Sequence, residues 1–145
     1  MAYLAVAWFV PLIAACGQRS NEEFIPAPNV AEGALMSALD AWKAGYPAGE
    51  VPNTKPAIFA TDTNRQVGQT LRSYKVLGET NGTSGRTYVV VLELDNPTQE
   101  IKTTYIVVGI DPLWVFRQED YELLMHWDHY MPPTPPPSLL PTERD

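Results

Sequence analysis

Two runs of β-branched and aromatic residues, joined by a short turn, limit what this chain can fold into more than any other feature. Residues 86–94 contain TYVVVLEL, residues 100–109 contain IKTTYIVVG, and the five residues 95–99 (DNPTQ) lie between them. Such residues favour strands, and a connection of this length and composition favours an antiparallel hairpin. The pattern therefore predicts an antiparallel sheet built around residues 86–109.

Alternation along the two runs predicts which side chains share a face of the sheet. In the first run these are Tyr88, Val90, Leu92 and Leu94, and in the second they are Ile101, Thr103, Tyr105 and Val107. Successive side chains of a strand point to opposite faces, so one face is expected to be buried. Three shorter segments are expected to be extended: 71–79 with a bulge near Ser73, 57–60, and a last strand at 114–117.

A helix is predicted over residues 29–45. Asn29 is placed to cap it, Glu32 follows at the spacing of a capping box, and Gly45 is a natural stop. One apolar stripe recurs every three or four residues, and it consists of Ala31, Ala34, Leu35, Ala38, Leu39 and Trp42. The small side chains in this stripe indicate close packing against a flat surface such as a sheet.

The order of these elements predicts a single α+β domain over residues 29–130. Residues 46–66 contain three prolines and are expected to be mostly irregular, and residues 118–130 have a helical pattern. Short connections between consecutive strands favour an antiparallel meander with the first helix packed on one side.

The N-terminus has the pattern of a targeting signal. Residues 1–15 carry no charge and end in Ile13-Ala14-Ala15, directly before Cys16, the chain's single cysteine. This resembles the bacterial lipobox, which implies a signal peptide at 1–15, cleavage before Cys16 and attachment of acyl chains to its thiol. Two acyl chains give stable anchoring in a bilayer. No cation precedes Arg19, and the alternative is a buried apolar helix with a core cysteine.

Two polar or proline-rich segments flank the expected domain. Residues 16–28 form the expected tether between the anchor and the domain. Residues 131–145 contain six prolines in fifteen positions, which predicts a polyproline-like or disordered tail that is dispensable for folding.

The first helix also carries a family resemblance. Ala38, Ala41, Trp42 and Gly45 form a helix ending that resembles the NTF2-like and cystatin-like group, in which a curved sheet wraps the first helix. The resemblance covers residues 30–117. It implies a shallow cystatin-like sheet on a helix, because two helices of the NTF2 cone have no counterpart in this sequence.

Composition narrows the possible partners. The 145 residues carry a formal net charge of −7, with a pI near 4.7, which argues against nucleic acid as a partner. The sequence shows no phosphate-binding loop, nucleophile elbow or zinc-protease motif, so no cofactor and no catalytic residue is predicted. His126 and His129 have a metal-ligand spacing, but a polar helix end is the favoured interpretation, and no metal is predicted.

Several aromatic and acidic residues are candidates for a site. Trp42, Tyr74, Tyr88, Tyr105 and Trp114 are the predicted ligand or partner surface. Asp40 and Asp62 are carboxylates that could work with the tyrosines in a pocket enzyme. The alternative, which the usual behaviour of these residue types favours, is that the tyrosines are half-buried sheet residues and that the C-terminal aromatics close the core under the last helix. Those aromatics are Trp114, Phe116, Trp127 and Tyr130.

These patterns favour a lipid-anchored bacterial envelope protein that faces out of the cytoplasm. We expect a non-catalytic module that binds an envelope protein or a small ligand, with the lipid bilayer as a second partner through Cys16. A small NTF2-like isomerase or dehydratase is one alternative, and a purely structural envelope component is another.

Overall fold

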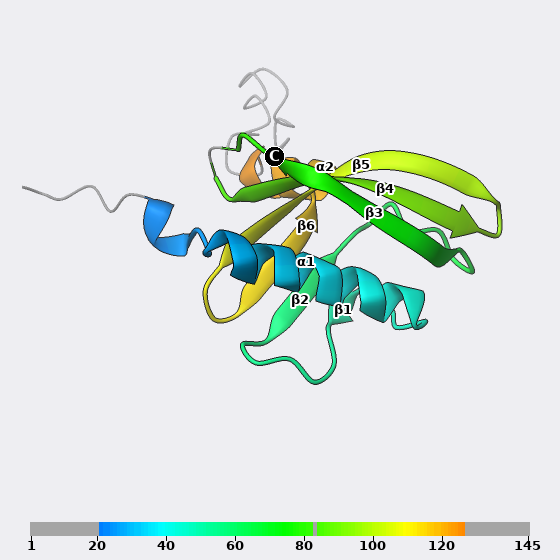
Figure 1. Ribbon diagram of the computed structural model, residues 1–145, viewed down its shortest axis with the longest axis horizontal. Coiled ribbons are helices and arrows are strands. Elements are labelled where there is room, and N and C mark those ends of the chain that lie inside the picture. The colour runs from blue at the N-terminus through cyan, green and yellow to red at the C-terminus, as the bar shows by residue number, and fades with distance from the viewer. Residues whose placement is uncertain (1–20, 83, 127–145) are drawn as a thin grey trace, which may run out of the picture.

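One long helix crosses one face of a six-stranded sheet (Figure 1). The computed structural model describes residues 21–82 and 84–126, so Cys16, His129 and the tail 131–145 lie outside the described residues. A short 3-10 helix, η1 (Asn21–Phe24), precedes the long helix α1 (Pro28–Lys43). The predicted α+β class is confirmed.

Helix α1 begins one residue earlier than expected. Pro28 occupies its first turn, and Ala27 is the N-cap residue without a side-chain capping bond. Proline suits this position because its fixed φ is helical and its missing N–H would have no intrahelical partner. The predicted Asn29 cap and its capping box with Glu32 were therefore wrong. Gly45, with φ of 94°, ends the helix as expected.

The sheet has the strand order β1-β2-β6-β5-β4-β3. Its strands are β1 (Gly49–Glu50), β2 (Ile58–Thr61), β3 (Thr70–Thr80), β4 (Arg86–Asp95), β5 (Gln99–Gly109) and β6 (Leu113–Arg117). The antiparallel meander from β3 to β6 is confirmed. The parallel pairing of β2 with β6 was not expected, because it joins segments from distant parts of the chain.

The predicted hairpin has the predicted faces. Tyr88 lies opposite Tyr105 and Val90 opposite Thr103, and all of these side chains are buried. The irregularity near Ser73 is confirmed, and a second one lies between Val76 and Gly78.

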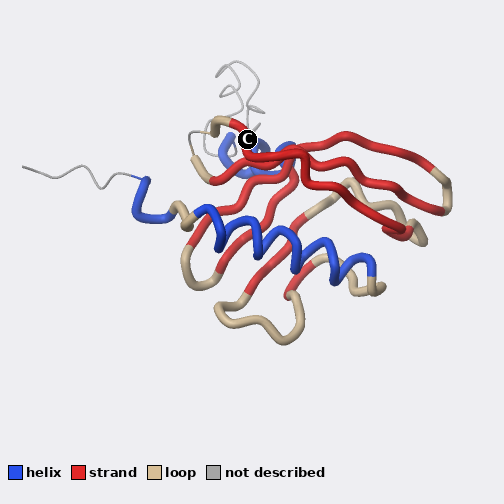
Figure 2. Tube along the Cα trace, in the orientation of Figure 1, coloured by secondary structure: helices blue, strands red, loops and turns tan. Residues whose placement is uncertain are grey.

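The core lies between α1 and the sheet. All six residues of the apolar stripe of α1 are buried against strand residues such as Leu92 and Val115. Helix α2 (Gln118–His126) lies on the other side of the sheet from α1 (Figure 2). Its Tyr121 ring packs against the ring of Phe116 in β6. Among the described residues, no helix is long and apolar enough to cross a membrane.

Candidate functional site

The predicted surface residues do not form one site. Trp42 is buried at the end of α1, and Tyr88 and Tyr105 are buried on the strand faces under that helix. Tyr74 of β3 is half-buried, and its hydroxyl donates a 2.8 Å hydrogen bond to Asp40 of α1. Trp114 is 37% exposed, on the opposite side of the sheet.

A polar cluster is buried where β2 ends. Asp62, whose side chain is only 1% exposed, accepts a 2.8 Å hydrogen bond from the Tyr105 hydroxyl. The Nη1 atom of Arg117 lies 3.2 Å from the other carboxylate oxygen, and Nε of Arg117 donates to the Thr103 hydroxyl at 3.1 Å. Each polar side chain of the cluster therefore stabilises the charge or orientation of another.

The topology brings these residues together. Thr61 of β2 pairs with Phe116 of β6, so Asp62 follows beside Arg117. Tyr105 of β5 is opposite Arg117 in the neighbouring antiparallel pair. Thus the parallel pairing of β2 with β6, which the sequence did not predict, positions the carboxylate.

Tyr105 is a hydrogen-bond donor in this cluster. Burial, together with the neighbouring Asp62 carboxylate, raises the pKa of Tyr105 well above its ordinary value. The phenol therefore stays protonated at neutral pH and donates a hydrogen bond to Asp62, so Tyr105 does not act as a base under these conditions.

Arg65 extends the cluster to the surface. Its guanidinium carbon lies 4.1 Å from the centre of the Trp42 ring, and its Nε atom lies 3.7 Å from Asp62. Burial lowers the pKa of Arg65, although the Asp62 carboxylate opposes this effect. The loop that carries Arg65 is fixed, because Asp120 of α2 accepts hydrogen bonds from both the backbone N–H and the hydroxyl of Thr63.

A groove of about 480 Å³ opens beside Arg65. One wall is the end of α1 with the following residues Tyr46 and Pro47, and the other wall is the loop from β2 to β3. Two buried nitrogens on residues of this groove have no hydrogen-bond partner among the described residues, namely Nε of Arg65 and Nε2 of Gln69. Both nitrogens are covered from solvent in this conformation, so the groove is lined by two residues whose donors are not all used.

The other two tyrosines of the predicted surface, Tyr74 and Tyr88, support the packing of α1. The Tyr88 hydroxyl donates to the Pro28 carbonyl at 3.1 Å. Burial and the hydrogen bond to Asp40 raise the pKa of Tyr74 to about 12, and burial raises the pKa of Tyr88. Both phenols thus form hydrogen bonds that connect helix α1 to the sheet.

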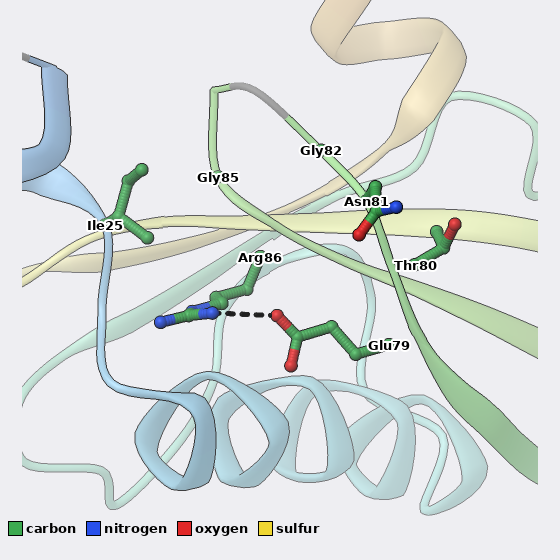
Figure 3. A pocket seen from close by; sticks show the side chains of 7 residues that line it. All are labelled: Ile25, Glu79, Thr80, Asn81, Gly82, Gly85 and Arg86. Atoms are coloured by element: carbon green, nitrogen blue, oxygen red, sulfur yellow. Dashed lines mark hydrogen bonds and ion pairs between the residues drawn. The ribbon is translucent and has the colours of Figure 1, made fainter.

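A second hollow, of about 410 Å³, lies between the end of β3 and the start of β4 (Figure 3). Arg86 and Glu79 point toward each other there and form an ion pair of 2.9 Å, and Nε of Arg86 donates to the Pro26 carbonyl at 3.1 Å. The guanidinium is thus engaged by the chain's own acceptors, and we assign Arg86 a structural role in attaching the start of α1 to the hairpin.

The outer face of the sheet, away from α1, carries an aromatic strip. Its members are Phe59, Trp114, Phe116 and Tyr121, and successive ring centres lie 4.8, 5.8 and 5.7 Å apart. The alternative in which Trp114 closes the core with the other C-terminal aromatics was wrong for this residue, because its side chain is exposed. Phe116, a second member of that group, is half-buried and packs against Tyr121 of α2. Trp127 and Tyr130, the remaining two members, lie outside the described residues.

Only one member of the histidine pair, His126, lies within the described residues. It is at the end of α2, where its Nδ1 atom lies 2.6 Å from the Glu122 carbonyl oxygen. Within residues 21–82 and 84–126, no group of three His, Cys, Asp or Glu side chains is placed to hold a metal ion.

The sequence analysis missed three residues that supply hydrogen-bond donors to the site. Arg65, Gln69 and Arg117 were not candidates, although Arg117 had a usable signal. It alternates with Leu113 and Val115, so it falls on the buried face of a strand, where a charge needs a partner. Arg65 and Gln69 lie in an irregular loop and had no such signal.

Comparison with protein-family models, with characterised proteins and with solved structures finds no match for this chain.

Proposed function

We propose that this protein is a non-catalytic binding module, held at a bacterial membrane by acyl chains on Cys16 and facing out of the cytoplasm. The lipobox-like sequence before Cys16 supports the anchor, with residues 1–15 as its signal peptide. The long helix α1 packed on one face of the sheet supports a cystatin-like domain, as a shallow relative of the NTF2-like group.

The observation that carries the binding function is the aromatic strip on the outer face of the sheet. Trp114 is exposed within it, and Ile110 and Met125 are exposed near it. Large contiguous apolar patches are uncommon on monomeric proteins and often mark interaction sites. Tryptophan and tyrosine are enriched among the residues that contribute most of the binding energy at such sites.

The charges around the strip indicate the kind of partner. Glu23 and Asp111 line a hollow of about 500 Å³ beside Trp114, and Glu119 and Glu122 lie on the exposed side of α2. The whole chain has a net charge of −7. We therefore propose a protein partner in the envelope that inserts apolar side chains between basic flanking residues.

The alternative is a small pocket enzyme of the NTF2-like type, an isomerase or dehydratase. The buried Asp62–Tyr105 pair favours it, because a carboxylate beside a phenol is a common acid–base arrangement. However, Asp62 also accepts bonds from Arg117 and from the backbone N–H of Asn64, so it is held as an ion-pair partner. A purely structural envelope component is the third candidate.

Replacing Cys16 with serine tests the anchor. The variant should move from the membrane fraction to the soluble fraction when cells expressing the full chain are fractionated, because serine cannot form the thioether. Unchanged membrane association would contradict the anchor.

A photo-crosslinking residue tests the binding surface. Placed at Trp114 in the intact protein in its native membrane, it should capture a partner, and the yield should fall as salt is raised. The control position is Val30, which is exposed on α1 at the other side of the sheet. Equal capture from both positions would refute the surface. Recovery of the protein alone, together with turnover of a small-molecule panel, would favour the enzyme.

A further inference from the structure

The groove beside Arg65 lies on the α1 side of the sheet, away from the aromatic strip, and has its own chemistry. The guanidinium of Arg65 lies over the Trp42 ring, and its side chain is 12% exposed. A guanidinium is a planar fork of donors that matches a carboxylate, and an aromatic face fixes its plane. Arg65 is thus oriented before any ligand arrives.

The Nε atom of Arg65 is covered from solvent and makes an ion pair with Asp62, but it donates no hydrogen bond among the described residues. Asp62 lies 3.7 Å from it, but the two carboxylate oxygens accept bonds from Tyr105, Arg117 and the N–H of Asn64. Burial lowers the pKa of Arg65, and this effect outweighs the opposing effect of the nearby Asp62 carboxylate.

Gln69 provides a second and independent observation. It is only 8% exposed, it lines the same groove, and its Nε2 atom has no partner among the described residues. Buried polar side chains in native proteins nearly always have a partner, so an unpaired amide in a groove points to a ligand acceptor. The amide is covered in this conformation and must turn toward the groove to meet that ligand.

Two further carboxylates next to the polar cluster, Glu119 and Asp120, do not line the groove and have other partners. Glu119 lies 3.6 Å from Nε of Arg117, but its side chain is 60% exposed to water, which screens its charge. Asp120 is occupied by the backbone and hydroxyl of Thr63. Tyr46, Pro47 and Val67 add apolar surface to the groove.

We propose that this groove binds a small organic carboxylate, whose oxygens accept hydrogen bonds from the guanidinium of Arg65 and the amide of Gln69. The apolar lining receives the carbon chain of the acid. This function is separate from partner binding at the aromatic strip, so either can fail without the other.

Nuclear magnetic resonance of the full chain tests the proposal, with sodium butyrate as the probe. The Nε–H signal of Arg65 and the side-chain amide signals of Gln69 should shift and saturate together, while sodium chloride at equal ionic strength should not saturate them. The absence of a saturable shift would overturn the proposal. Tighter binding of sodium phosphate than of butyrate would overturn the assignment to carboxylates.

Three variants separate recognition from folding. Arg65→Gln should weaken butyrate binding by about tenfold or more, because it removes a charge-assisted hydrogen bond. Arg65→Lys keeps the charge and loses the fork, and it should bind with intermediate affinity. The matched control is Arg72→Gln, which removes an exposed arginine paired with Glu93 and Asp95 and should bind like the unmodified protein. Unchanged affinity in a folded Arg65→Gln variant would refute the site.

Discussion

The hydroxyl of Tyr105 donates a 2.8 Å hydrogen bond to Asp62, although the two residues are 43 positions apart in the chain. This bond joins β5 to the loop that follows β2, and it lies beneath the groove that carries Arg65. It contributes to stability and positions the loop, so it links the fold to the proposed carboxylate site.

Removing the phenol oxygen should destabilise the protein. Tyr105→Phe leaves the ring in place and deletes a buried bond to a charged acceptor, so we expect the free energy of unfolding to fall by about 1–3 kcal/mol. Urea denaturation measures this. Tyr74→Phe is the control, because its bond to Asp40 is exposed, and it should cost less than about 1 kcal/mol. Equal losses would contradict a special role for the buried pair.

Removing the charge of Asp62 should lower the free energy of unfolding by more than Tyr105→Phe does. Asp62→Asn leaves Arg117, which is only 7% exposed, without its buried anion, and loss of one partner of a buried ion pair costs about 3–5 kcal/mol. Asp40→Asn is the matched control at an exposed position. Thermal unfolding of the three proteins compares them, and an Asp62→Asn variant as stable as the control would show that the pair contributes nothing net.

Stability should fall at alkaline pH. The folded state raises the pKa of Tyr105 well above its ordinary value, so between about pH 10 and that raised value the unfolded chain releases a proton that the folded chain keeps. The stabilisation is therefore complete below about pH 10 and is lost above it. The urea midpoint should fall as the pH is raised through this range, and it should fall less for Tyr105→Phe than for the unmodified protein. An equal fall in the two proteins would argue against a raised pKa of Tyr105.

Replacing glycine with alanine should change the stability of the protein in opposite directions at Gly109 and Gly33. Gly109 has φ of 88° at the turn between β5 and β6, and an added Cβ would lie 2.5 Å from the Pro112 carbonyl oxygen, so Gly109→Ala should destabilise by more than about 1 kcal/mol. Gly33 lies within α1, where an added Cβ would meet no neighbouring atom within 4 Å, so Gly33→Ala should stabilise by about 0.5–1 kcal/mol. Calorimetry measures both, and the same sign in both would contradict the geometry.

Much of the fold was predictable because it is locally encoded. The β4–β5 hairpin follows from alternation and a turn, and the buried stripe of α1 follows from helical spacing. The N-terminus of α1 was mispredicted because Pro28 begins the helix without the side chain of Asn29. Strand β1 is only two residues long, too short to leave a periodic pattern.

The candidate site was only partly predictable because it depends on contacts between distant segments. Asp62 and Tyr105 were candidates from their residue types, but nothing local pairs them. The register that sets Asp62 beside Arg117 comes from the parallel pairing of β2 with β6, and alternation within one strand carries no information about a partner that far away.

The parallel pairing of β2 with β6 also restricts the order in which the strands can join the sheet during folding. Strand β6 comes last in the chain but lies inside the sheet, between β5 and β2. The β3–β4–β5 meander can pair as soon as it is synthesised, whereas β1 and β2 have no place on the sheet until β6 has been made. Closing the gap between Asp62 and Arg117, 55 positions apart, is thus a late step, and contacts of such long range slow folding. Until then, Asp62 lacks its Arg117 partner, so we expect the loop that lines the groove to be held in place only after β6 has joined the sheet.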